Sequence, residues 1–199
     1  IEDSYKQLFP NNEIIGGLAF VCAQKIGPAK VHHIDYGGIA IGCFPNGKSK
    51  KVERLSTLFK QSNIPCRISE MIIFDRYKKL IWNVPFNPLS VIYGGVTTDI
   101  LLGNSEIKHR IMSIMKEVQS VATADGYALT DDILEKNIQD TLKMKPYKTS
   151  MCCDWEAGRP LERQAIVGNI IQKAAQLQIE VPYINQLYDE LGQFDKAIT

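Results

Sequence analysis

The sequence predicts a mixed α/β segment followed by an all-α helical domain, and two patterns support this fold class. The first part alternates strand-like runs (EIIGGLAFVCAQ, KVHHID, GIAIGCF and IPCRI) with glycine-containing turns and one amphipathic helix. From Ser69 onward helical periodicity recurs and no further strand is evident. We therefore expect two domains, residues 1–68 and residues 69–199.

The first segment has the rhythm of an α/β layer. It should open with a short helix over Ser4 to Phe9, followed by a buried strand over 13–24. Two turns are expected between the next strands, at Gly27-Pro28 and at Gly37-Gly38. An amphipathic helix then falls within 45–63 and a last short strand within 64–68. The apolar stripe of that helix is expected to consist of Val52, Leu55, Leu58 and Phe59.

The second segment is typical of a compact helical domain with short loops. Helices are expected over residues 70–83, 87–93, 105–125, 131–144, 162–177 and 184–194. Ser150 and Asp154 bracket a further turn of helix, which Gly158-Arg159-Pro160 breaks.

Composition narrows the function classes. The chain is 45% hydrophobic and 23% charged with a net charge of +1, which is ordinary for a globular protein. This charge gives no electrostatic reason to expect nucleic acid or an anionic membrane as partner. No apolar run approaches a membrane-spanning length and no signal peptide opens the chain, so we expect a cytoplasmic protein. Because the chain begins at Ile1, as if within a helix, we also expect it to be a fragment of a longer protein.

Cysteine and histidine patterns do not indicate a metal site. The five cysteines are an odd number without a CxxC pair, which favours free thiols in a reducing compartment. His32 and His33 are adjacent on a strand, so their side chains should point to opposite faces and cannot share one metal ion.

The strongest indication of chemistry is a row of polar residues in an otherwise apolar segment. Lys79, Asn83 and Asn87 are spaced four residues apart in KKLIWNVPFNPLS. On a helix each step advances about 40°, so the three side chains share one face over about 12 Å. Polar groups on a mostly buried helix are costly unless they bind something. Pro85 should kink this helix beside the row, which suits a ligand cleft, but a kinked core helix with capping asparagines is an equally good interpretation.

A second polar cluster lies in TSMCCDWEAGRPLERQAIVGN. Each member has an ordinary structural explanation: Ser150 as a helix N-cap and Glu162 as a carboxylate in the first turn of a helix. Their presence together with the lysine row is what indicates a function.

These blocks resemble the ketopantoate reductase family. The resemblance rests on EIIGGLAFVCAQKIGPAKVHH, KKLIWNVPFNPLSVIYGG, SMCCDWEAGRPLERQAIVGN and IEVPYINQLYDEL, and it covers essentially the whole chain. It implies the second half of a Rossmann domain in residues 1–68, followed by a helical domain of the 6-phosphogluconate dehydrogenase C-terminal type. In the family the active site lies between the two domains. No GxGxxG fingerprint occurs here, so the resemblance also implies that this segment alone is inactive.

The resemblance implies roles for single residues. Lys79 matches the catalytic lysine that protonates the ketone oxygen while NADPH supplies hydride. Asn83 and Asn87 match residues that hold the hydroxyl and oxo groups of the substrate, and Ser150 matches a contact to its carboxylate. Glu162 matches the acid that contacts the nicotinamide side of the cofactor and orients the lysine.

The cofactor contacts and the departures complete what the resemblance implies. Ala23 matches a backbone contact to the NADP(H) cofactor. Thr97 and Tyr147 stand where well-studied members have asparagines that help to read the substrate. The reaction type therefore transfers better than the substrate.

The sequence thus predicts part of an NADPH-dependent 2-keto acid reductase, with ketopantoate, the precursor of pantoate in pantothenate biosynthesis, as the leading small-molecule substrate. A homodimer through the helical domain is compatible with this prediction. Two alternatives stay open: a non-catalytic helical module for dimerisation or ligand binding, and a related two-domain dehydrogenase acting on another 2-keto acid. The choice between NADP and NAD is set outside these residues.

Overall fold

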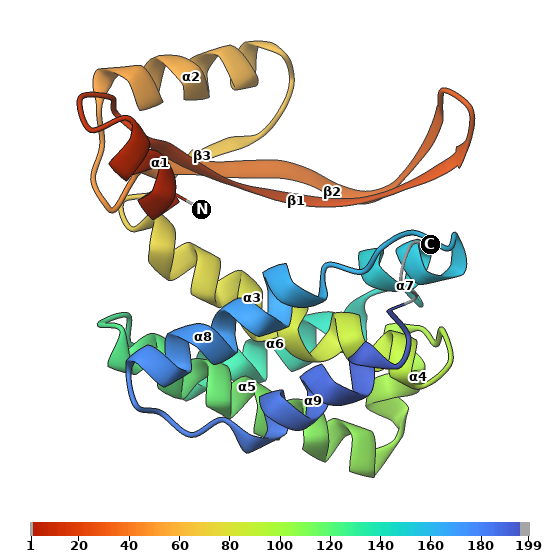
Figure 1. Cartoon of the computed structure of the whole chain (residues 1–199). Helices are drawn as coiled ribbons and strands as arrows, with labels where there is room; N and C mark the ends of the chain where they lie inside the picture. Colours follow the sequence, from red (N-terminus) through yellow and green to blue (C-terminus); the bar gives the residue numbers. More distant parts are fainter. Residues whose placement is uncertain (1, 196–199) are drawn as a thin grey trace. The chain divides into compact units, whose positions relative to one another are not determined.

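The computed structural model describes residues 2–195, with the side chains of Asp3 and Gln24 excepted. The chain divides into two compact units, Ile1–Arg76 and Tyr77–Thr199 (Figure 1). The division falls within a helix, whereas the composition of the sequence changes at Ser69.

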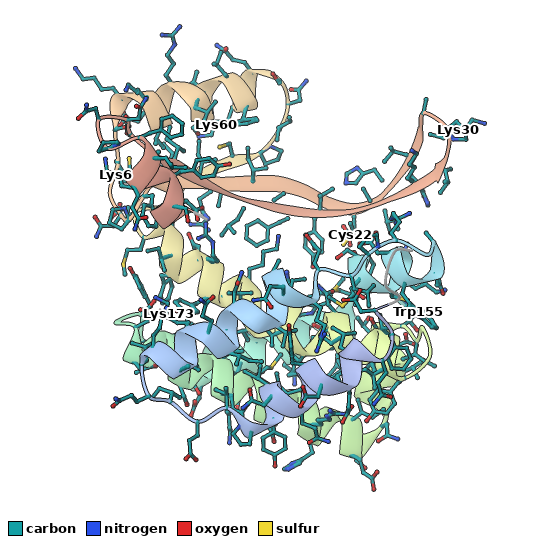
Figure 2. The ribbon with its side chains drawn as sticks, in the orientation of Figure 1. Lys6, Cys22, Lys30, Lys60, Trp155 and Lys173 are labelled. Atoms are coloured by element: carbon teal, nitrogen blue, oxygen red, sulfur yellow. The ribbon has the colours of Figure 1, made fainter. Side chains whose placement is uncertain are left out.

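The first unit combines a three-stranded sheet with two helices, and the start of a third. Its elements are α1 (Glu2–Leu8), β1 (Ile15–Gly27), β2 (Lys30–Cys43), α2 (Lys50–Gln61), β3 (Cys66–Ile68) and the first residues of α3 (Ile72–Ile92). The strand order is β1-β2-β3, with β1 and β2 antiparallel and β2 and β3 parallel. Parallel strands need a crossover, and α2 supplies it. Figure 2 shows Lys30 at the tip of the β1–β2 hairpin.

Gly37 and Gly38 do not form the expected turn, because β2 runs through them as one strand. Phe20 is opposite Gly38 and Val21 is opposite Tyr36, so Gly37 is an extra residue on β2. Tyr36 and Gly37 take positive φ angles of 61° and 129°. The glycine pair therefore makes a β-bulge, which bends the strand without ending it.

One of the hydrophobic core clusters of this unit lies between α2 and the sheet. Ile41, Val52 and Cys66 are buried there, with Leu55 and Phe59 packed against them. Leu58 was expected in this stripe but is 51% exposed, and Ser56 is buried instead. Position 56 is one helical turn beyond Val52, whereas position 58 points away from the sheet.

Strand β1 is less buried than expected. Phe20 is 39% exposed and Val21 is 49% exposed, while Leu18 and Cys22 are buried. The alternation of buried and exposed residues is interrupted at Phe20 and Val21, where the register of β1 against β2 shifts.

Glycine is required where β2 passes the start of α3. A Cβ atom at Gly42 would stand 2.4 Å from the carbonyl oxygen of Ser69. The amide of Ser69 donates to the Ile41 carbonyl at 2.7 Å, so this close approach is part of the sheet edge. Only a residue without a side chain fits there.

The second unit is all helical among its described residues. It contains most of α3, followed by α4 (Thr98–Gly103), α5 (Ser105–Ala124), α6 (Asp131–Lys143), α7 (Ser150–Glu156), a π-helical turn η1 (Gln164–Gly168), α8 (Asn169–Gln176) and α9 (Pro182–Gly192). The expected fold class, an α/β part followed by an all-α domain, is confirmed. No helix within residues 2–195 is long and apolar enough to cross a membrane.

Helix α3 is one continuous helix, where two were expected. Pro85 and Pro88 lie inside it and remove two backbone hydrogen bonds. The surrounding residues Val84, Phe86 and Leu89 are fully buried. Burial of this segment therefore holds the helix together across both prolines.

Helix α3 ends at a glycine pair. The amide of Gly94 donates to the Val91 carbonyl at 2.9 Å, and the amide of Gly95 donates to the Ser90 carbonyl at 2.8 Å. Gly94 takes a φ of 86°. This is a Schellman motif, which satisfies the last carbonyls of the helix and terminates it.

Helix α9 begins without a cap of its own. Val181 occupies the N-cap position and makes no side-chain cap bond, and Pro182 follows it. The carboxylate of Glu117, on α5, accepts hydrogen bonds from the amides of Tyr183 at 2.9 Å and Ile184 at 2.8 Å. Glu117 therefore caps α9 from a neighbouring helix.

We expect Glu117→Ala to lower the free energy of unfolding by about 1–2 kcal/mol, because two amides at the start of α9 lose their acceptor. Urea denaturation of this chain measures the change. Glu135→Ala, an exposed position on α6, is the control and should change stability by less than about 0.5 kcal/mol. Equal effects of the two substitutions would contradict the capping role.

Candidate functional site

The predicted polar row lies on α3 and becomes more buried along the helix. Lys79 and Asn83 are half-buried, and Asn87 is only 1% exposed. Their four-residue spacing within one continuous helix places them on one face. The row therefore leads from the partly accessible surface of α3 into the interior of the second unit.

Lys79 is electrostatically coupled to Glu162. Burial lowers the pKa of Lys79 below the ordinary value for lysine, and the negative charge of Glu162 partly offsets this by raising the pKa. The two residues are far apart in sequence, so the fold brings them together. A partly desolvated ammonium under the influence of a carboxylate is suited to proton transfer.

Glu162 stands just before an irregular helix. It is exposed, and the chain then enters the π-helical turn η1 before the regular helix α8 begins. One α-helix was expected over 162–177. A π-helical turn is rare and is often found at functional sites.

The η1 turn is held by contacts from α9. The guanidinium of Arg163 stacks 3.7 Å above the ring of Tyr188, and its Nε donates to the Tyr188 carbonyl at 2.9 Å. The hydroxyl of Tyr188 also donates to the side-chain carbonyl of Gln164 at 2.9 Å. The chain on the C-terminal side of Glu162 is thereby fixed to α9.

Asn87 presents an unusual buried group. Its Oδ1 has no accessible surface to speak of and no hydrogen-bond partner among the described residues. Buried polar atoms are nearly always bonded, so an orphaned acceptor calls for an explanation. A bound ligand that donates a hydrogen bond would supply one.

Ser150 is not the N-cap of its helix, which was the structural explanation considered for it. The N-cap of α7 is Thr149, whose side chain accepts from the amide of Cys152 at 3.1 Å. Ser150 is the first residue of α7 and is exposed. Thr149 is fully buried, so its hydroxyl is committed to structure while that of Ser150 is accessible.

Two hydrogen bonds connect α7 to the polar row. The hydroxyl of Ser90 donates to the backbone carbonyl of Asn87 at 2.7 Å, and it lies 2.6 Å from the hydroxyl of Thr149. Ser90 is also fully buried. These bonds bring the start of α7 next to the buried end of the row on α3.

Tyr147 and Thr97, the two departures noted in the sequence, lie where α4 and α7 begin. Thr97 is the N-cap of α4, and the next amide, that of Thr98, donates to the Tyr147 carbonyl at 3.0 Å. The ring of Tyr147 lies 6.4 Å from that of Trp82, between centroids. Tyr147 therefore packs against α3 beside the polar row.

The remaining predicted residues have simpler surroundings. Ala23 belongs to the first unit, where it is exposed on β1 and paired with His33. Asp154 accepts a hydrogen bond at 2.7 Å from Arg159, and this pair closes the turn after α7. Among the described residues, no group of three histidine, cysteine or acidic side chains could hold a metal ion.

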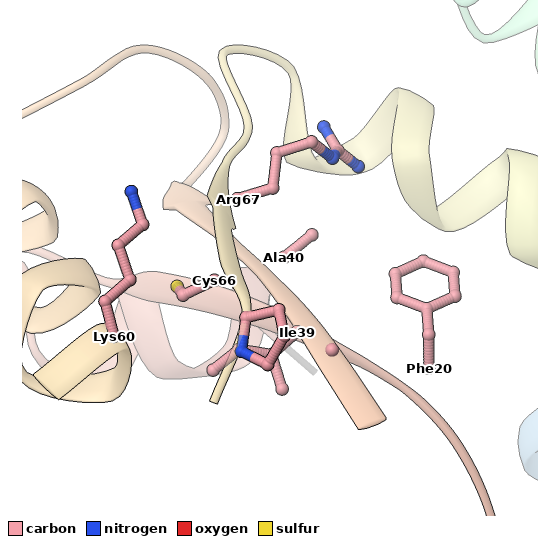
Figure 3. A pocket seen from close by; sticks show the side chains of 8 residues that line it. Phe20, Ile39, Ala40, Lys60, Cys66 and Arg67 are labelled. Atoms are coloured by element: carbon pink, nitrogen blue, oxygen red, sulfur yellow. The ribbon is translucent and has the colours of Figure 1, made fainter. Parts of the chain in front are cut away.

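The first unit has a concavity of its own, with a volume of about 440 Å³ (Figure 3). It is lined by Phe20, Gly38, Ile39, Ala40, Lys60, Pro65, Cys66 and Arg67. The lining contains two cationic side chains, Lys60 and Arg67. Arg67 forms an ion pair with Asp75 at 2.9 Å, so its charge is already neutralised. None of the predicted site residues lines this concavity.

Sequence reasoning missed Ser90 and Thr149 as residues connected to the site. Thr149 had a local signal, because threonine is also among the preferred N-cap residues and it is adjacent to Ser150. Ser90 had none, because its partner lies 59 residues further along the chain.

We expect Asn87→Leu to raise the free energy of unfolding by about 1 kcal/mol, because an unbonded buried acceptor is replaced by an apolar group of similar size. Thermal and urea unfolding of this chain measure the change. Ser90→Ala, on the same helix and equally buried, should instead lower stability because its hydroxyl is bonded. A loss with Asn87→Leu as large as that with Ser90→Ala would contradict this account.

Family models identify both parts of the chain. The model described as ketopantoate reductase PanE/ApbA C terminal matches residues 72–195, and the model described as ketopantoate reductase PanE/ApbA matches residues 1–46. The 2-dehydropantoate 2-reductase of Nostoc sp. is 36% identical over 98% of this chain, and that of Pyrococcus abyssi is 26% identical over 84%. These matches span 62% and 56% of the two relatives' own lengths.

Solved structures agree with these matches. The crystal structure of 2-dehydropantoate 2-reductase from Methylococcus capsulatus superposes with a TM-score of 0.91 and 37% identity, covering all of this chain and 64% of that one. A ternary structure of D-mandelate dehydrogenase with NADH and anilino(oxo)acetate has a TM-score of 0.88 at 21% identity, covering 97% of this chain and 63% of that one. This second likeness shows the fold alone. The resemblance seen in the sequence is therefore confirmed, and the chain belongs to the ketopantoate reductase PanE/ApbA family.

Proposed function

We propose that this chain is the C-terminal portion of an NADP(H)-dependent 2-keto acid reductase, with ketopantoate as the leading substrate. The observation that carries the proposal is the half-buried Lys79. Burial lowers its pKa, and the charge of Glu162 raises that pKa again in part. It shares one helix face with two carboxamides, one of which has an unbonded buried oxygen. Family membership and the names of the relatives support the same reaction class.

Lys79 is the proposed proton donor. A protonated lysine polarises the keto group and delivers a proton to its oxygen as the alcohol forms. A lowered pKa makes the ammonium a stronger acid than an exposed lysine. Glu162 keeps enough of it protonated, and it orients the ammonium.

Asn83, Asn87 and Ser150 are the proposed substrate contacts. A hydroxyl on the substrate would donate to Oδ1 of Asn87 and satisfy it. Asn83 would hold the oxo group, and the exposed hydroxyl of Ser150 would donate to the carboxylate. All three are compatible with a small 2-keto acid that carries a hydroxyl group.

The cofactor is proposed to be NADP(H), which supplies hydride to the keto carbon when bound. Glu162 and the backbone of Ala23 are the proposed contacts from this chain. The sequence holds no GxGxxG loop for the pyrophosphate, and the chain spans less than two thirds of its relatives. We therefore propose that the chain by itself does not turn over, and that the complete protein is a cytoplasmic enzyme that forms a homodimer through the helical domain.

A second candidate is a related dehydrogenase for another 2-keto acid. It is favoured by Tyr147, which packs an aromatic ring against Trp82 beside the polar row. A panel of 2-keto acids, read by loss of NADPH absorbance, separates the two candidates. A non-catalytic binding module is the third reading, and it would bind such acids without reducing any of them.

Lys79→Ala should lower kcat by at least about 100-fold, because the proposed acid is removed, and change KM little. Asn87→Ala should instead raise the KM for ketopantoate by about tenfold, because a substrate contact is lost. Both are measured by NADPH oxidation in a protein that joins this chain to a GxGxxG segment. A Lys79→Ala variant with near-normal turnover would show that another group is the acid.

Glu162→Gln should shift the basic limb of the pH–kcat profile to lower pH. Ketone reduction needs protonated Lys79, so kcat falls as pH rises through the pKa of Lys79. Glu162 raises the pKa of Lys79, and its neutral replacement lets burial lower that pKa further. Glu156→Gln, an exposed acid at the end of α7, is the control. An unmoved limb in Glu162→Gln would contradict the coupling.

A further inference from the structure

A chain of buried hydrogen bonds connects the start of α7 to the polar row on α3. The amide of Cys152 is 3.1 Å from Oγ1 of Thr149, which is 2.6 Å from Oγ of Ser90, which is 2.7 Å from the carbonyl oxygen of Asn87. Both hydroxyls are fully buried. Water therefore does not compete with any of these bonds.

The protons in this chain can have only one direction. A hydroxyl carries one hydrogen, and that of Ser90 is donated to the Asn87 carbonyl. The short contact between the hydroxyls then requires Thr149 to donate to Ser90. Thr149 in turn accepts from the amide of Cys152. Each hydroxyl donates once and accepts once, so the chain is fully satisfied and has a single arrangement.

The two ends of the chain are next to residues of the proposed site. It terminates on the backbone of Asn87, a member of the row, and Thr149 precedes the exposed Ser150. The segment before Ser150 is held a second time, where the Tyr147 carbonyl accepts from Thr98. Residues 147–150 are therefore fixed to both α3 and α4.

Helix α7 is short, with seven residues and no acidic residue in its first turn, so it gains little stability from its own hydrogen bonds. Beyond its first residue it is anchored by the buried side chains of Met151 and Cys152. Ser150 is exposed, and the hydroxyl of Thr149 is the contact that ties this end of the helix to α3.

We propose that Ser90 and Thr149 are positioning residues, which set the distance between Ser150 and the row formed by Lys79, Asn83 and Asn87. The inference rests on the proposed function, in which Ser150 binds the substrate carboxylate. Neither hydroxyl is available to the substrate, because each already donates one hydrogen bond and accepts one within the unit. They act by holding Ser150, the proposed carboxylate contact, at a fixed distance from the groups that bind and protonate the keto group of the substrate.

The test uses Ser90→Ala, which cuts the connection to α3 while leaving Thr149 to cap α7. In a protein joining this chain to a GxGxxG segment, the KM for ketopantoate should rise about tenfold while kcat stays within about twofold. Thr149→Ser keeps every bond and should behave as wild type. Ser56→Ala, another buried serine but in the first unit, is the matched control and should leave KM unchanged.

Hydrogen exchange gives a readout that does not need activity. The amide of Cys152 should exchange at least about tenfold faster in Ser90→Ala than in wild type or Ser56→Ala, because α7 is then less firmly held. If Ser90→Ala does not fold, Ser90→Cys, whose thiol is only a weak donor and acceptor, leaves Thr149 to cap α7 and should show the same two effects to a smaller degree. Unchanged exchange, or unchanged KM in an active protein, overturns the proposal. A wild-type protein that reduces no ketopantoate overturns the proposed function and the carboxylate role together, and exchange then decides whether the pair orders α7.

Discussion

The burial of helix α3 is the constraint on which the second unit depends. The helix contains two prolines and a row of polar side chains, each of which disfavours a buried helix. It is nevertheless continuous, with Ile81, Val84, Phe86 and Leu89 fully enclosed by the other helices. Apolar packing on the remaining faces offsets the missing backbone bonds and keeps the row straight enough to act as one surface.

The electrostatics of the row follow from this burial. Partial desolvation lowers the pKa of Lys79, and a single acid, Glu162, raises it again. Glu162 is accessible, and its position is set by an irregular π-helical turn that Arg163 and Tyr188 hold against α9. A lysine on a regular helix is thus coupled to an acid that an irregular helical turn places.

The parts of the structure that sequence could predict are those that depend on local spacing. The four-residue steps of the row, the α/β to all-α order and most helix ends follow from periodicity and turn residues. Features set by tertiary contact did not follow. Burial keeps α3 continuous across Pro85. Gly37 is an extra residue in β2 and forms a bulge instead of a turn. Ser56 is buried in the core, where Leu58 was expected. Thr149 rather than Ser150 is the cap, and the bond of its hydroxyl to Ser90 joins residues distant in sequence.

Asn87 and Ser90 differ in how the polar atoms of their side chains are satisfied. They are three residues apart and equally buried, yet the Ser90 hydroxyl is fully bonded while Oδ1 of Asn87 has no partner among the described residues. An unbonded buried acceptor destabilises the unliganded fold, so a ligand that supplies the missing donor gains both a contact and the relief of that penalty. The fold thus retains an unsatisfied acceptor at a defined position, and a hydroxyl-bearing ligand that reached it would be favoured over an analogue without the hydroxyl.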